Sequence, residues 1–137
     1  MWQTYAILSA VFAALTAIFA KVGVSGINSN LATAIRTLVI LFITWGIVFF
    51  TADIKEIKDI SARTFTFLIL SGLATGMSWL FYFKALQVGD ASKVAPVDKL
   101  SVVFTILLAY LFLGEPLSTK VIFGGLLILS GSLVLIS

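Results

Sequence analysis

Residues 31–51 read LATAIRTLVILFITWGIVFFT, an apolar stretch with one charged side chain, Arg36. A helix rises about 1.5 Å per residue, so this stretch is long enough to cross the roughly 30 Å hydrocarbon core of a bilayer. Lipid offers no hydrogen bonds to backbone groups, and a helix supplies all of its own. The stretch therefore predicts a transmembrane helix.

Gly, Pro, Asn and charged residues divide the whole chain into five such apolar segments. The expected helices are residues 5–22, 31–51, 65–86, 93–113 and 119–136. A membrane β-barrel needs segments of about 10 residues with alternating hydrophobicity, and these segments are longer and do not alternate. The charge-dense stretch 53–63 is expected outside the membrane. The predicted fold is all-α, an integral membrane bundle of five helices in a single domain, residues 1–137.

Composition supports this fold and excludes several kinds of function. The chain is 61% hydrophobic and only 11% charged, whereas about a quarter of the residues of a soluble domain are charged. It contains no histidine and no cysteine, which removes thiol chemistry and the usual metal ligands. No cofactor and no metal are expected. The basic residues form no stripe or tail, so nucleic acid is not an expected partner.

Three charged residues lie inside the expected spans: Arg36 in the second, and Asp98 and Lys99 in the fourth. A charge near the bilayer centre costs at least about 2.5 kcal/mol, so such residues usually face the bundle interior, pair, or line a pathway. Arg36 and Lys99 are long enough to extend their charged groups toward the interface instead. Asp98 is short and needs a partner. Arg36 is the expected one, because simple threading puts both on one side of the membrane.

Polar side chains also follow helical spacing on three segments. Steps of three and four residues place each set on one face of its helix. The sets are Ser71, Thr75, Ser78 and Tyr82; Asp98, Ser101 and Thr105; and Thr33, Arg36 or Thr37, and Thr44. One interpretation is a polar cavity shared by the three helices. The other is ordinary hydrogen bonding between helices or to each helix's own backbone.

The distribution of charge bears on orientation. On the side of the N-terminus, the basic residues (Lys55, Lys58, Arg63, Lys120) are balanced by acidic ones. The opposite half carries Lys21, Arg36, Lys84, Lys93 and Lys99 against Asp90 and Asp98, which is the whole formal excess of +3. An electropositive vestibule there would attract anions. Counted near span ends, Lys and Arg show no clear bias between the sides, so the orienting signal is weak.

Three motifs stand out in the second half of the chain: YFKALQ (82–87), GDASKVAPVDKLS (89–101) and FLGE (112–115). With AALTAIFAKVG (13–23) and NSNLATAIRT (28–37) in the first half, they resemble the EamA-type repeat of the drug/metabolite transporter superfamily. Longer members carry ten helices as two inverted repeats, and this chain looks like the single-repeat form. The resemblance implies a transporter of small metabolites, often an exporter, that is completed by pairing with a second copy.

These observations predict a secondary transporter, in the plasma or inner membrane, of a small polar or anionic metabolite. A homodimer, possibly antiparallel, and membrane lipid are the expected partners. Arg36 would bind an anionic group or hold Asp98, which is also the candidate proton-coupling site, because a low-dielectric cavity favours a protonated carboxyl. The other expected substrate-binding residues are Ser78, Trp79, Tyr82, Lys99 and Ser101. Pro96 is either a hinge or a first-turn proline.

Three alternatives remain open at this point. The chain could be an interaction subunit, one half of a heterodimer that does not transport alone. It could be a passive channel, which would conduct without saturation. A membrane enzyme is the weakest alternative, since without histidine or cysteine its catalysis would rest on one buried aspartate.

Overall fold

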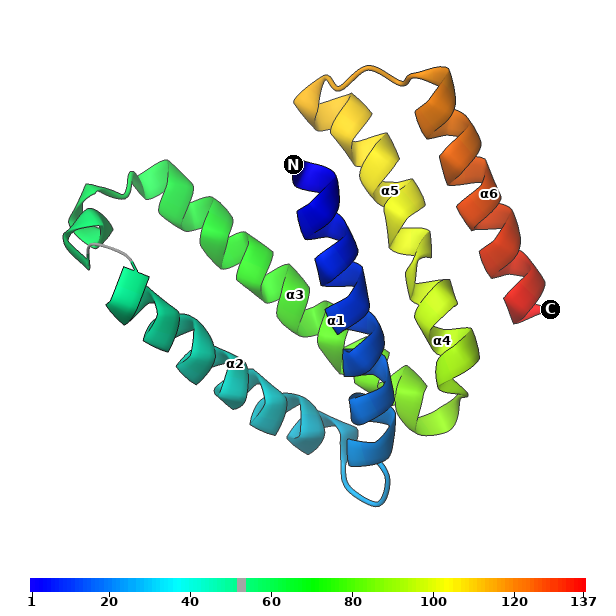
Figure 1. The fold of residues 1–137 in the computed structure, drawn as a ribbon, viewed down its shortest axis with the longest axis horizontal. Helices are drawn as coiled ribbons and strands as arrows, with labels where there is room; N and C mark the ends of the chain where they lie inside the picture. The colour runs from blue at the N-terminus through cyan, green and yellow to red at the C-terminus, as the bar shows by residue number, and fades with distance from the viewer. Residues whose placement is uncertain (52–53) are drawn as a thin grey trace. The chain divides into compact units, whose positions relative to one another are not determined.

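The computed structural model describes residues 1–51 and 54–137 and consists of helices joined by short connections (Figure 1). Asp53, the first residue of the stretch expected outside the membrane, lies outside the described residues. The elements are α1 (Trp2–Gly23), α2 (Ser29–Thr51), the 3₁₀ turn η1 (Ile54–Asp59), α3 (Ala62–Val88), α4 (Ala91–Asp98), α5 (Leu100–Leu108), the π-helical turn η2 (Ala109–Leu113) and α6 (Thr119–Ile136).

The prediction of an all-α protein with five membrane-spanning helices is confirmed. Within the described residues there is no strand, and five helical stretches are long and apolar enough to cross a bilayer. The fourth stretch, Ala91–Leu113, is made of α4, α5 and η2. The first four stretches begin two or three residues before the apolar segments. At α3 the cause is a cap, because Ser61 Oγ accepts the backbone N–H of Thr64 at 3.1 Å.

The turn before α6 shows why the last two spans separate. Gly114 follows η2 in the left-handed conformation, with φ +67°, which only glycine adopts without steric cost. Residues 114–118 are not helical, and Ser118 then caps α6 by accepting the backbone N–H of Val121 at 3.3 Å. The chain therefore reverses here because Gly114 ends the fourth span and Ser118 caps the start of α6.

The chain forms two compact units. One comprises Ala20–Gln87, which contains the end of α1, all of α2 and most of α3. Its buried residues gather where α1 ends, α2 begins and α3 ends, and include Val24, Phe83 and Leu86, each at most 2% exposed. Two hydrogen bonds join these segments: Lys21 Nζ donates to the Leu86 carbonyl, and Gln87 Nε2 donates to the Ile27 carbonyl, both at 2.7 Å.

The other unit comprises Met1–Phe19 and Val88–Ser137. In it, α6 packs along both α4 and α5 (Figure 1). Gly125 and Ser132 are the buried residues of α6, seven positions apart and therefore on one face. Large apolar side chains elsewhere on these helices are exposed, as expected of surfaces whose solvent is lipid.

Candidate functional site

Arg36 of α2 lies against two aromatic rings of α3. Its guanidinium carbon Cζ is 3.7 Å from the centroid of the Trp79 ring and 5.3 Å from that of Phe83. Trp79 and Phe83 are one turn apart, so they lie on the same face of α3. A cation within about 6 Å of a ring centroid is attracted by the negative face of the ring, and tryptophan gives the strongest attraction. The charge predicted inside the second span is therefore held by an aromatic platform.

The guanidinium sits deep in the span. Arg36 is seven residues, about 10 Å, from the start of α2, and Trp79 is nine residues, about 14 Å, from the end of α3. Gln87, at the end of α3, donates to the Ile27 carbonyl just before α2, and this bond holds the two ends together. Phe83 lies one turn nearer to those ends, yet the guanidinium is closer to Trp79. The guanidinium therefore lies nearer to the ring that is further from these ends; whether Arg36 faces the bundle interior stays a prediction.

The aromatic rings leave the hydrogen-bonding capacity of Arg36 unused. A guanidinium carries five N–H donors and no acceptor. Within the described residues of the Ala20–Gln87 unit, Arg36 makes contacts with rings but no hydrogen bond and no ion pair. A charged group inside a membrane span is costly, and such residues usually pair with another group or line a pathway. The predicted pairing with Asp98 stays a prediction, because that residue belongs to the other unit.

Asp98 has a neighbour of its own. Its Oδ2 is 3.5 Å from Lys99 Nζ, and the two side chains are 38% and 55% exposed. The pair lies where the fourth span is interrupted, since α4 ends at Asp98 and α5 begins at Leu100. Pro96 is the sixth residue of α4, so it is not a first-turn proline. The hinge interpretation of Pro96 stays a prediction.

The threonines of the three polar sets bond to their own helices. The hydroxyls of Thr33, Thr37, Thr44, Thr75 and Thr105 each donate to the carbonyl four residues earlier, at 2.8 to 2.9 Å. These hydroxyls are thus hydrogen-bonded within their own helices. The polar cavity shared by the three helices stays a prediction. Of the other expected site residues, Trp79 and Tyr82 are half-buried, whereas Ser78 and Ser101 are exposed.

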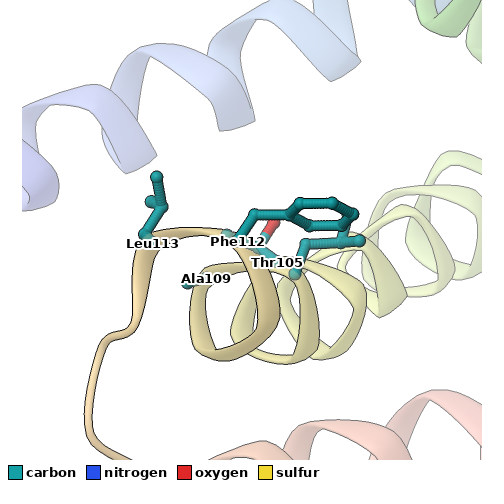
Figure 2. Close-up of a pocket in the computed structure, with 5 residues that line it drawn as sticks. Thr105, Ala109, Phe112 and Leu113 are labelled. Carbon is teal, nitrogen blue, oxygen red and sulfur yellow. The ribbon is translucent and has the colours of Figure 1, made fainter.

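A pocket of about 340 Å³ lies on the fourth span. It is lined by Thr105, Leu108, Ala109, Phe112 and Leu113, which follow one face of α5 and η2 (Figure 2). The polar side chain among them, Thr105, already donates its hydroxyl to the Ser101 carbonyl. The pocket is therefore an apolar recess without a group that could recognise a polar ligand.

The sequence analysis missed Phe83, Ser132 and the carbonyl group of Pro96. Phe83 is 2% exposed and forms the second half of the ring platform under Arg36. Its spacing of four residues from Trp79 was a readable signal. Ser132 Oγ donates to the Pro96 carbonyl at 3.0 Å, a contact between α6 and α4 that no spacing along the chain indicates.

Comparison with known proteins agrees with this architecture. The chain matches the EamA-like transporter family over residues 1–137. It is 54% identical over 134 residues to a Sinorhizobium protein named "Uncharacterized transporter in cobO 3'region", covering 98% of this chain and 95% of that protein. No solved structure matches the chain. Five apolar helices in the described part of the chain and a family match over residues 1–137 identify a multi-pass membrane protein that belongs to the EamA-like transporter family.

Proposed function

We propose that this membrane transporter is a secondary transporter that exports a small polar or anionic metabolite across the plasma or inner membrane. Arg36 binds the anionic group of the substrate. Trp79, Phe83 and Tyr82 form the aromatic wall beside it, and Ser78 and Ser101 offer hydrogen bonds. Asp98 is the coupling residue, with Lys99 as its counter-charge in the resting state.

One observation carries this proposal: a guanidinium held deep in a span, on a tryptophan ring, with its N–H donors unused inside its own unit. The ring fixes the position of the cation without neutralising it. The planar fork of arginine matches carboxylate and phosphate oxygens in pairs, and a lysine cannot reproduce this geometry. A small anion supplies the missing charge.

A dimer is part of the proposal. The chain has one five-helix repeat, and the Sinorhizobium protein named as a transporter is of nearly the same length. Transporters of many folds place their substrate between two repeats near the midplane, and inverted repeats are common among them. Gly124 and Gly131 of α6 leave open space where a side chain would stand, which suits close approach by another helix. The weak orienting charge favours an antiparallel pair.

A ligand-stabilisation screen on the purified protein tests this function. Ligands that bind the native state raise its melting temperature, so metabolites grouped by charge identify the substrate class. We expect carboxylates or phosphates to stabilise the protein, and neutral or cationic analogues not to. Charge-assisted hydrogen bonds contribute about 1.5 to 3 kcal/mol, so Arg36→Gln should weaken binding by roughly tenfold to a hundredfold.

The matched control is Lys84→Gln, which removes an exposed cation from the same helix that carries Trp79. Lys84 bonds only weakly to Gln87, at 3.4 Å. The Lys84→Gln variant should therefore bind the ligand as tightly as the wild type does. Equal losses in the two variants would mean that general positive charge, and not a site at Arg36, attracts the ligand. Stabilisation by cations alone would contradict the proposed substrate class.

A further inference from the structure

The fourth span contains a proline and, close after it, a break in the helix. Proline has no backbone N–H, so Pro96 cannot donate to the carbonyl of Ser92, and its ring crowds the preceding turn. Three residues later the helix is interrupted at Lys99. The Lys99 N–H donates to the Pro96 carbonyl at 3.0 Å, and the Lys99 carbonyl accepts the N–H of Val102 at 2.9 Å. A tight turn at Lys99 therefore joins α4 to α5.

A side chain from another helix fastens this turn. Ser132 of α6 is 3% exposed, and its Oγ donates to the Pro96 carbonyl at 3.0 Å. The threonines of the spans behave differently, because their hydroxyls donate within their own helices. The Pro96 carbonyl thus accepts two donors, one from the turn and one from α6. Both bonds converge on the atom that defines the start of the break.

The same face of α6 also touches the second half of the broken span. Gly125 lies seven residues before Ser132, which is about two helical turns. A Cβ atom at Gly125 would lie 3.1 Å from Ile106 Cδ1 of α5, so the two helices approach closely there. α6 is therefore fixed to α4 at Ser132 and to α5 at Gly125, and it spans the break between them.

We propose that Ser132 is a positioning residue that sets the angle between α4 and α5. It does so because α6 contacts both helices and spans the break between them. The charged pair Asp98–Lys99 sits in the turn that this bond fastens. Ser132 thereby places the pair without touching it. Any bending of the fourth span at Lys99 has to break or lengthen the bond from Ser132 to Pro96. This inference does not depend on the substrate or on the role of Arg36.

Hydrogen exchange followed by mass spectrometry, on the protein in lipid nanodiscs without ligand, tests this role. Ser132→Ala removes the donor, and Ser130→Ala removes an exposed hydroxyl from the same helix as the control. Hydrogen bonds between membrane helices stabilise by amounts that correspond to about threefold, and at most about twentyfold, in an opening equilibrium. We expect hydrogen exchange at the backbone amides of Lys99 and Val102 to be faster by that factor in Ser132→Ala. In Ser130→Ala the exchange rates should not change.

A variant of similar size separates the hydrogen bond from simple packing. Ser132→Cys, a weak donor, should reproduce the acceleration, also if the alanine variant does not fold. Pro96→Ala keeps the carbonyl group that accepts from Ser132, so Ser132→Ala should accelerate exchange in that background as well. The proposal is overturned if Ser132→Ala exchanges like Ser130→Ala, or if the acceleration spreads along α6.

Discussion

Removal of the Trp79 ring is the sharpest test of how Arg36 is held. The contact measures 3.7 Å from Cζ to the ring centroid, well inside the limit of about 6 Å for such pairs. Cation–π pairs contribute about 0.5 to 1 kcal/mol when exposed and about 2 kcal/mol or more when desolvated. Both Arg36 and Trp79 are half-buried. We therefore expect a coupling of about 1 to 2 kcal/mol, which is about five- to thirtyfold in an unfolding equilibrium.

A double-mutant cycle measures this coupling without the other effects of each substitution. The variants are Arg36→Met, Trp79→Leu and their combination, unfolded by SDS in mixed micelles. Arg36→Met with Phe83→Leu should give a smaller coupling, because that ring is 5.3 Å from Cζ and phenylalanine attracts a cation less strongly.

The control cycle pairs Arg36→Met with Trp45→Leu. Trp45 is on the same helix, nine residues or about 14 Å along the axis, and its ring contacts Phe49. Substitutions that far apart are usually additive, so the coupling should be zero within error. If Trp79 shows no more coupling than Trp45, the ring does not hold the cation, and the argument for an anion site at Arg36 loses its basis.

Three further predictions follow from other parts of the molecule. Asp98→Asn should keep the fold and weaken the proton dependence of transport, and an unchanged pH profile would exclude Asp98 as the coupling residue. The orientation can be tested with two single-cysteine variants, one near Lys58 and one near Asn28, labelled in intact cells with an impermeant thiol reagent. If the chain inserts in two orientations, both sites should be partly modified. Complete labelling at one site and none at the other would exclude an antiparallel homodimer. In micelles that hold the protein as a monomer, Gly124→Ala should be more stable than the wild type by up to about 1 kcal/mol, because alanine favours helix. Gly125→Ala should gain less stability, because its Cβ would lie 3.1 Å from Ile106 Cδ1. Equal melting temperatures for the two variants would contradict the close approach of α6 and α5.

The five spans were readable from the sequence because their length and lack of charge leave no other fold for a chain in lipid. Arg36 could likewise be singled out from the sequence, because a charged side chain inside an apolar span is costly in lipid. Its ring partner Phe83 could have been found from the spacing to Trp79, but the choice of α3 as the neighbour of α2 depends on tertiary packing. Pro96 and the charged residues Asp98 and Lys99 interrupt the apolar run of the fourth span, but none of them predicts that the helix breaks at Lys99. The bond from Ser132 joins residues 36 positions apart, and no periodic pattern encodes it.

The joining of α2 and α3 at one end has a mechanical consequence. Lys21, near the end of α1, and Ile27, in the connection before α2, are hydrogen-bonded to the end of α3, while the far halves of α2 and α3 expose their side chains. A rotation of α2 relative to α3 would be centred on these bonded ends, beside Ile27 and Leu86. With α2 23 residues long, a rotation of about 10° at the pivot moves the Thr51 end by about 6 Å, whereas Arg36, near the pivot, moves by only about 2 Å. The helices can thus swing at their far ends while the guanidinium stays on its ring.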